Sequence, residues 1–266
     1  MTPPPLPADS GGTPARALRY AVRVPMLLWH VCVHLPVVLL LGVPTLAARG
    51  WRGEAPGHRA IRWWQGGLMW IFGFRMRRVG TPLQGGVLFV ANHVSWIDIS
   101  ALHSQRMMGF VAKREIRSWP LVGWLASRGE TIFHLRGNQE SLGGVLQEMV
   151  ERLRDGRGVG VFPEGRTRGG DHVGPFHARI FLAAVEADVV VQPVALRYGA
   201  DGAAQSVVAF GERESFFANL LRLLGEQVQP VEVMFLEPIL PANAEGRRRI
   251  ADVARQRIVA ALGPVG

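Results

Sequence analysis

The sequence predicts an α/β fold, in which a mostly parallel sheet is flanked by helices and preceded by an N-terminal membrane-associated helical segment. From residue 81 onward, short apolar runs rich in β-branched residues alternate with helical stretches, a pattern typical of parallel sheets. The segment 24–48 contains no Asp, Glu, Lys or Arg and is long enough to cross a bilayer. A chain of 266 residues can form one large domain with such an appendage.

The charge and the cysteine content restrict the classes of function. The chain carries 30 basic and 21 acidic residues, a formal net charge of +9, which favours an anionic partner. It has no long Arg/Lys run, zinc-finger spacing or aromatic RNA-binding signature, so we expect a membrane surface as the partner and no nucleic acid. Cys32 is the single cysteine, which excludes an internal disulfide and a cysteine-based metal cluster.

The N-terminal region is predicted to contain a tail followed by a membrane segment. Residues 1–18 are rich in Pro, Gly and Ser and lack periodicity, so we expect a disordered tail. Residues 19–50 form the apolar membrane segment, and three prolines in it favour a kinked or re-entrant helix: Pro25, Pro36 and Pro44. A signal peptide with a weak cleavage site at 45–47 is the alternative. Basic residues flank both ends, so the orientation stays open.

Residues 51–80 mix tryptophan and phenylalanine with arginine, which predicts an amphipathic helix in the headgroup layer of a membrane. A helix packed on the following domain is the alternative, and one helix can satisfy both. For residues 81–266 we expect strands at 87–91, 110–112, 131–135, 159–162, 189–196, 206–210 and 231–235. The expected helices are 97–103, 121–127, 140–154, 178–187, 216–224 and 247–262.

The first chemical motif lies in the stretch 87–98. An apolar run of β-formers ends shortly before His93, and Asp98 follows five positions later. Imidazole is the side chain that accepts protons near neutral pH, and a carboxylate against its second nitrogen fixes the tautomer. We therefore interpret His93 as a base that activates a hydroxyl on the substrate, oriented by Asp98. The alternative is a helix capping box formed by Ser95 and Asp98, with His93 as an ordinary loop residue.

The second motif, 158–168, is another buried strand that runs into a polar turn containing glycine. Arg166 and Arg168 lie beside Gly165 there, a combination suited to binding phosphate, and Glu164 can hold one of the arginines. The alternative is a solvated, arginine-rich loop. The chain lacks a dinucleotide fingerprint, a Walker A motif, a G-x-S-x-G elbow and an H-E-x-x-H motif, and the missing elbow argues against a serine hydrolase.

Taken together, these stretches resemble the glycerolipid acyltransferase family that includes 1-acylglycerol-3-phosphate acyltransferases. The family's N-H-x-x-x-x-D block matches 92–98, and its F-P-E-G-T-R-like block matches 162–167. Its F-V-A-K and P-L-x-G-W stretches match 110–113 and 120–124, and its T-I-F-x-x-R segment matches 131–136. A late strand with a buried proline matches 191–195. The resemblance covers residues 80 to 200 in the right order.

The resemblance implies that 81–266 is an O-acyltransferase domain that needs no metal and no cofactor. His93 takes the proton of a lysolipid hydroxyl while Asp98 orients it, and the oxygen attacks the thioester of acyl-CoA or acyl-carrier protein without an acyl-enzyme. The implied acceptor is 1-acylglycerol-3-phosphate, at the cytoplasmic face of a bacterial inner membrane. The residues expected to bind substrate are Lys113, Arg136, Glu164, Gly165, Arg166, Arg168 and Pro193.

Two departures from the family pattern concern the head group. The family reads Gly-Thr-Arg where this chain has Gly-Arg-Thr-Arg, so Arg166 and Arg168 are alternative contacts for a phosphate. Glu130 stands where the family has a glycine six positions before Arg136, and a carboxylate repels a phosphate.

Three other functions stay open from the sequence. The stretches 175–177 and 192–198 are similar to a bacterial subgroup that includes lyso-ornithine lipid acyltransferases, so an acceptor without phosphate is one alternative. The second is hydrolysis of a lysolipid or phosphoester, with His93 activating water. The third is a non-catalytic lipid carrier with the same fold.

Overall fold

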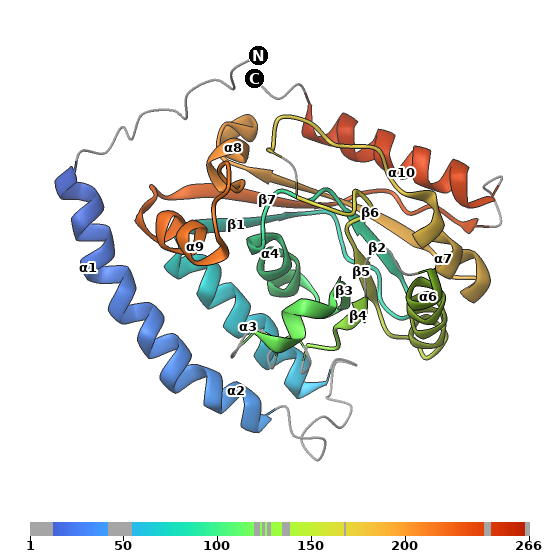
Figure 1. Cartoon of the computed structure of the whole chain (residues 1–266), viewed down its shortest axis with the longest axis horizontal. Coiled ribbons are helices and arrows are strands. Elements are labelled where there is room, and N and C mark those ends of the chain that lie inside the picture. Colours follow the sequence, from blue (N-terminus) through green and yellow to red (C-terminus); the bar gives the residue numbers. More distant parts are fainter. Residues whose placement is uncertain are drawn as a thin grey trace.

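The computed structural model describes residues 13–41, 55–119, 123, 126, 129–134, 139–167, 169–241 and 246–263. The strands are β1 (Phe74–Val79), β2 (Leu88–Ala91), β3 (Gly109–Lys113), β4 (Ile132–His134), β5 (Val159–Val161), β6 (Val191–Tyr198) and β7 (Gln229–Phe235). The helices are α1 (Thr13–Trp29), α2 (Leu35–Leu41), α3 (Pro56–Ile71), α4 (Ile97–Gln105), α6 (Gln139–Arg154), α7 (Leu182–Ala187), α8 (Gln205–Val208), α9 (Phe216–Gly225) and α10 (Gly246–Leu262). Figure 1 shows their arrangement.

The strands form a seven-stranded sheet in the order β1-β7-β6-β2-β5-β3-β4. Every neighbouring pair is parallel except β6 and β7, which confirms the predicted, mostly parallel sheet. Because β2, β5, β3 and β4 run in the same direction, their carboxyl ends lie along one edge. Loops at such an edge commonly carry the binding and reactive residues of α/β proteins.

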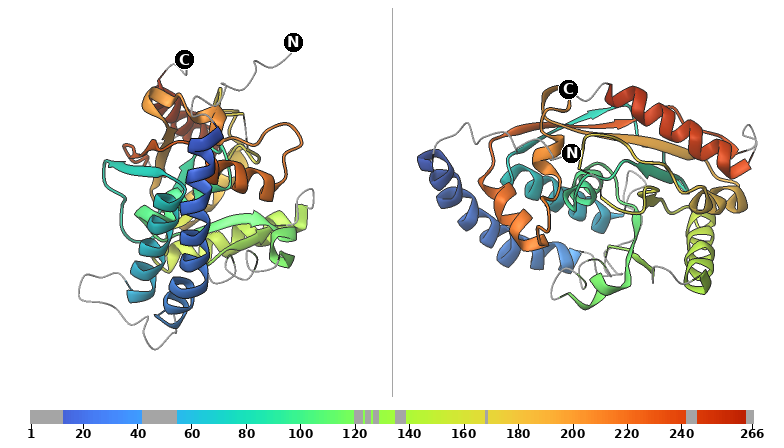
Figure 2. Two further views of the ribbon diagram at one scale, coloured as in Figure 1. Left: turned by 90° about the vertical axis from the view of Figure 1, so that its left-hand side faces the viewer. Right: turned by 45° about the horizontal axis from the view of Figure 1, so that its top comes forward.

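Different helices cover the two faces of the sheet (Figure 1, Figure 2). Phe89 of β2 packs in an apolar cluster with residues of α3, α4 and α9. Its neighbours Leu88 and Val90 point the other way, into a cluster with residues of α6, α7 and α10. A strand that is buried on both faces must be apolar at every position, which explains the uninterrupted apolar run of β2.

The N-terminal segment is helical over most of its described length. A five-residue π turn, His30–His34, joins α1 to α2, and Pro25 lies inside α1. The stretch Pro14–Leu40 is long and apolar enough to cross a membrane by length and composition. The predicted disordered tail 1–18 is wrong for residues 13–18, because α1 begins at Thr13; residues 1–12 and 42–50 lie outside the described residues.

Helix α1 packs against α9 and is hydrogen-bonded to its carboxyl end (Figure 1). Arg19 Nε donates a hydrogen bond to the carbonyl oxygen of Gly225 (2.6 Å), and Arg23 Nη1 donates to those of Leu224 (3.0 Å) and Glu226 (2.7 Å). Carbonyl groups at the end of a helix lack partners inside the helix and carry partial negative charge, so arginines stabilise them well. The same segment therefore combines a membrane-like composition with specific bonds to the domain.

The predicted helix over 51–80 is wrong beyond Ile71. Residues 51–54 lie outside the described residues, α3 ends at Ile71, and Gly73 adopts a left-handed conformation (φ 87°) that turns the chain into β1. Strand β1 pairs with β7 in parallel, at an edge of the sheet, and exposes its arginines. The arginines of β1 alternate with apolar residues, a pattern that also fits one side of an amphipathic helix; in the structure they form the exposed side of an edge strand.

The strand predicted at 206–210 is also wrong, because this stretch contains the short helix α8. The chain turns sharply after β6, where Gly199 and Gly202 have φ values of 80° and 87°, and it leaves the sheet at that point. The other six predicted strands overlap β2 to β7. The helix predicted at 121–127 lies outside the described residues except for Gly123 and Ala126.

Candidate active site

His93 is the second residue after β2, at the carboxyl edge of the sheet. The residue between them, Asn92, is buried. Its side chain donates a hydrogen bond to the carbonyl of Leu196 (3.0 Å) and accepts one from the amide of Leu196 (2.8 Å), so it takes the place of a backbone partner for β6. This pair of bonds fixes where β2 ends. The loop that follows, from His93 to Trp96, leads directly into α4.

The predicted pairing of His93 with Asp98 is present. His93 Nδ1 lies 2.8 Å from Asp98 Oδ2, and the same oxygen accepts hydrogen bonds from the amides of Val94 (2.7 Å) and Ser95 (2.9 Å). Asp98 is fully buried, whereas the His93 side chain is 17% exposed. Because a carboxylate only accepts hydrogen bonds, Nδ1 carries the proton, and Nε2 is left as a proton acceptor.

The capping-box alternative is met only in part: Asp98 accepts from the amide of Ser95 (2.9 Å), but the Ser95 hydroxyl caps no amide of α4, and His93 is bonded to Asp98. Trp96 precedes α4 and makes no side-chain cap, and the Ser95 hydroxyl donates instead to Asn219 Oδ1 of α9 (3.4 Å). The indole nitrogen of Trp96 donates to the same oxygen (2.9 Å). Asn219 is fully buried, so α9 supplies a second fixed partner for the loop besides Asp98.

The ring of His93 lies flat on an aromatic side chain. Its centroid is 4.0 Å from that of Phe162, with an angle of 13° between the planes, and Phe162 stacks in turn on Phe110 at 5.5 Å. Phe162 directly follows β5, the strand beside β2, and Phe110 lies near the start of β3, the next strand in the sheet. The imidazole therefore has an apolar support on one side and its carboxylate partner at the edge.

Glu164 joins the two sequence motifs. It is buried, and its Oε1 accepts from the amide of His93 (2.9 Å) while its Oε2 accepts from the amide of Gly174 (2.8 Å). These oxygens are turned toward the backbone of the protein, so Glu164 positions the His93 loop, a role that the sequence motif alone did not indicate. Gly165 follows with a left-handed φ of 72°, next to the ring of His177.

The remaining predicted residues differ in burial, and two of them lie outside the described residues. Arg166 is exposed on the turn after β5, and Lys113 is exposed at the end of β3; both lie at the carboxyl edge that carries His93. Pro193 is buried in β6 opposite Val90 of β2. Arg136 and Arg168 lie outside the described residues. Among the described residues, no group of three or more His, Cys, Asp or Glu side chains is arranged to hold a metal ion.

Tyr198 is a site residue that the sequence did not single out. It is the last residue of β6, it is fully buried, and its hydroxyl donates to Asp98 Oδ1 at 2.6 Å. Burial, and next the negative charge of Asp98, hold the pKa of Tyr198 well above its usual range, so the hydroxyl stays protonated. The alternation Val194, Leu196, Tyr198 places the tyrosine on the face covered by α4, a signal that was available in the sequence.

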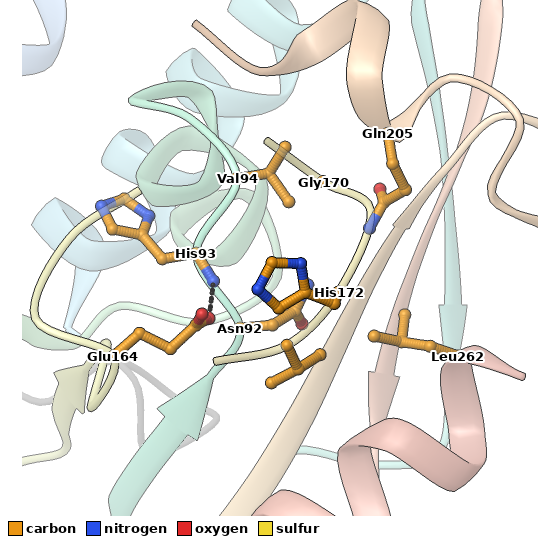
Figure 3. A pocket seen from close by; sticks show the side chains of 9 residues that line it. Asn92, His93, Val94, Glu164, Gly170, His172, Gln205 and Leu262 are labelled. Atoms are coloured by element: carbon orange, nitrogen blue, oxygen red, sulfur yellow. Dashed lines mark hydrogen bonds between the residues drawn. The ribbon is translucent and has the colours of Figure 1, made fainter. Parts of the chain in front are cut away.

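A small cavity lies behind the His93 loop (Figure 3). His93 contributes its backbone to this cavity, and its imidazole points away from it, on the other side of the bond to Glu164. The cavity is therefore separate from the space around the imidazole. The residues that line it are Asn92, His93, Val94, Glu164, Gly170, His172, Val173, Gln205 and Leu262.

Comparisons with known proteins identify relatives of this chain. Residues 75–197 match the family model described as "Acyltransferase". A lyso-ornithine lipid O-acyltransferase of Pseudomonas aeruginosa is 36% identical over 232 residues, which cover 85% of this chain and 89% of that protein. A 1-acyl-sn-glycerol-3-phosphate acyltransferase of Neisseria gonorrhoeae is 38% identical over 126 residues, which cover 47% of this chain and 49% of that protein.

A solved structure has the same fold. The crystal structure of the 1-acyl-sn-glycerophosphate acyltransferase PlsC from Thermotoga maritima matches with a TM-score of 0.70 at 19% identity, over 93% of this chain and 96% of that one. The similarity to the Pseudomonas protein extends over most of both chains and the motif residues meet at one edge of the sheet. The chain therefore belongs to the acyltransferase family that acts on lysolipids.

Proposed function

We propose that this protein transfers a fatty acyl group from the thioester of acyl-CoA or acyl-carrier protein to a hydroxyl of a lyso-ornithine lipid. The observation that carries the chemistry is the bond between His93 Nδ1 and the buried Asp98 carboxylate. In the neutral imidazole this bond keeps the proton on Nδ1, so that Nε2, in a side chain that is 17% exposed, can accept a proton.

The reaction needs one base and no nucleophile of the protein. Nε2 of His93 removes the proton of the acceptor hydroxyl as its oxygen attacks the thioester carbonyl carbon. The tetrahedral intermediate collapses, the carbon–sulfur bond breaks, and the proton passes from the imidazolium to the leaving sulfur. Asp98 stabilises the imidazolium that forms in between. General-base assistance of this kind contributes about 10²–10⁴ in rate, and the positioning of two bound substrates adds to it.

The relatives support a lyso-ornithine lipid over a phosphate-bearing acceptor. Lyso-ornithine lipid O-acyltransferases of Pseudomonas aeruginosa and Brucella abortus match over 85% and 80% of this chain, whereas the Neisseria 1-acyl-sn-glycerol-3-phosphate acyltransferase matches over 47%. The second candidate acceptor is 1-acylglycerol-3-phosphate, because Arg166 presents an exposed guanidinium on the turn after β5.

Glu130 does not bear on the choice of acceptor. It precedes β4 and lies beside Gly109 at the amino end of β3, whereas His93 lies at the carboxyl edge of the sheet.

We further propose that the protein works at the cytoplasmic face of a bacterial inner membrane. The apolar helix Pro14–Leu40 supports a membrane location, and both substrates of the proposed reaction carry long acyl chains. In this proposal Lys113, Arg136, Arg166 and Arg168 contact the polar parts of the substrates, and Pro193 shapes the site for the acyl chain. Gly165 gives the turn room to approach the acceptor.

The test compares substrates on the purified full chain in detergent micelles. Each acceptor, lyso-ornithine lipid and 1-acylglycerol-3-phosphate, is supplied with each donor, acyl-CoA and acyl-carrier protein, and products are measured by mass spectrometry. We expect the diacylated ornithine lipid to form fastest. Faster formation of phosphatidate would overturn the proposed acceptor, and release of free fatty acid without transfer would indicate a hydrolase.

The variant His93→Ala tests the role of the base. We expect it to lose at least 10²-fold in kcat while keeping its melting temperature. The matched control is His58→Ala, which removes a partly exposed histidine from α3 and should keep the native rate. A lipid carrier would bind lysolipid equally well in both variants and would show no turnover in the native protein.

A further inference from the structure

The carboxyl end of β6 reaches further along the site than its neighbour β2. In the parallel pairing of the two strands, Ala91 at the end of β2 lies opposite Val194, and β6 continues for four more residues to Tyr198. This extension runs beneath the loop that carries His93. It brings the hydroxyl of Tyr198 to Asp98, which belongs to the first turn of α4.

The two oxygens of Asp98 have different partners. Oδ2 faces the reactive side, where it meets His93 Nδ1 at 2.8 Å and the amides of Val94 and Ser95. Oδ1 faces the protein interior, where it accepts from the Tyr198 hydroxyl at 2.6 Å. Because a carboxylate can rotate about the bond to its Cβ, a donor fixed on Oδ1 determines where Oδ2 points.

Tyr198 itself is held on several sides. Its amide donates to Gln205 Oε1 (2.9 Å), and its carbonyl accepts from the amide of Ala204 (2.9 Å). Its ring packs edge-on against Phe74 of β1, with 5.8 Å between the centroids. The hydroxyl therefore occupies a position set by β1, β6 and the turn after β6, independently of the His93 loop.

We propose that Tyr198 is a positioning residue for acyl transfer, which orients Asp98 and, through Asp98, the imidazole of His93. This inference rests on the proposed function. Tyr198 does not touch the substrate and exchanges no proton during the reaction: its hydroxyl stays protonated and keeps donating to Oδ1. Its contribution is that Nδ1 of His93 stays bonded to Oδ2, so that Nε2 keeps one direction while the acceptor hydroxyl approaches.

The test is the variant Tyr198→Phe, which keeps the ring against Phe74 and removes the hydroxyl. We expect kcat to fall by about tenfold, the effect of one hydrogen bond to a charged group, and KM for both substrates to stay within about twofold. The matched control is Tyr20→Phe, which removes the hydroxyl that donates to the Leu221 carbonyl (2.9 Å). Because Arg19 and Arg23 still bond α1 to α9 in this control, it should keep the native kcat, with both variants assayed well below their melting temperatures.

A second measurement does not depend on turnover. In protein labelled with ¹⁵N-histidine, the Nδ1 proton of His93 is identified by its loss in His93→Ala. We expect this proton to exchange with water at least about fivefold faster in Tyr198→Phe than in the native protein or in Tyr20→Phe, because the carboxylate holds it less firmly. This comparison remains possible if a lower yield of folded variant complicates the kinetics.

The outcomes separate this inference from the proposed function. A native kcat in Tyr198→Phe, or an unchanged exchange rate of the His93 proton, overturns the role of Tyr198 while His93→Ala remains inactive. A rise of KM without a fall of kcat also overturns it, because positioning of the base acts on the chemical step. Transfer activity that survives in His93→Ala overturns the proposed function itself.

Discussion

Two buried carboxylates hold the loop on which His93 lies. Asp98 accepts from the amides of Val94 and Ser95, and Glu164 accepts from the amide of His93 itself. Backbone amides of one loop thus point toward two fixed negative charges that come from different elements. A buried carboxylate is stable only when its oxygens are hydrogen-bonded, so each carboxylate and the loop stabilise one another.

The variant Glu164→Gln tests this role. An amide has one accepting oxygen, so it cannot accept from both His93 and Gly174, and its NH₂ group then faces a backbone N–H. We expect kcat to fall by about tenfold, corresponding to about 1.4 kcal/mol, with KM for the acceptor nearly unchanged. The measurement is steady-state kinetics of acyl transfer.

The control for this prediction is Glu186→Gln, which changes an exposed glutamate at the end of α7 and should leave the kinetics unchanged. If Glu164→Gln instead raised KM for the acceptor at constant kcat, Glu164 would be a contact of the head group, as the family resemblance implies, and the positioning role would be wrong.

At the scale of elements, a directed chain of hydrogen bonds joins the π turn to α3. The carbonyl of Trp64 accepts from His30 Nε2 (2.9 Å), so in its neutral form His30 accepts at Nδ1 from His34 Nδ1 (2.9 Å). His34 then accepts at Nε2 from the indole of Trp29 (3.2 Å). Neutral tautomers satisfy every one of these atoms, and the wide π turn places both histidines on the side of α3.

The variant Gly67→Ala tests this packing. A methyl group at Gly67 would lie 2.6 Å from Cε1 of His30, whose ring is stacked on Trp64 and bonded at both nitrogens, so the ring has little room to move. We expect overpacking to lower the free energy of unfolding by about 1–3 kcal/mol, measured as a lower melting temperature.

The neighbouring glycine of α3 offers a matched control. A methyl group at Gly66 would meet no atom within 4 Å, and alanine is favoured over glycine in a helix by about 1 kcal/mol. Gly66→Ala should therefore keep or raise the melting temperature. Equal effects of the two substitutions would show that His30 does not limit the distance between these helices.

At the scale of the whole molecule, the strands that the sequence predicts best are those buried on both faces of the sheet. Strand β2 was found because every residue of it is apolar, and the meeting of His93 with Asp98 followed from their spacing. Strand β1 was missed because an edge strand with exposed arginines resembles a helix face. The alternation along β6 indicates which face of the sheet carries Tyr198, but the contacts of Tyr198 and Asn219 are not predictable from a local pattern, because their partners lie 100 or more positions away along the chain.

The stability of the protein in acid depends in part on the carboxylate of Glu214, which is hydrogen-bonded to two residues of α9. Hydrogen bonds from Arg222 and Asn219 lower the pKa of Glu214 to about 2. A carboxyl group whose pKa is lowered by folding stabilises the protein above the unfolded pKa, near 4.5, and this stabilisation is lost as the pH falls toward 2. It amounts to on the order of 2 kcal/mol after allowance for screening by solvent.

The variant Glu214→Gln should therefore melt about 4–8 °C below the native protein at pH 7, and this difference should shrink between pH 5 and about pH 2. The measurement is the melting temperature as a function of pH for both proteins. Glu237→Gln, at an exposed glutamate after β7, serves as the control without such a difference. A difference that does not change with pH would contradict the assignment to the ionised carboxylate.

The bonds from Arg19 and Arg23 to the end of α9 determine how far the chain can be shortened from its N-terminus without loss of activity. A chain shortened to begin at α3 would leave the last carbonyls of α9 without these arginines, and α9 carries the asparagine that steadies Ser95 and Trp96. We expect such a shortened chain to lose activity even toward dispersed, water-soluble substrates. If so, hydrogen bonds from the N-terminal helix support the loop of His93 through α9, in addition to any contact of that helix with lipid.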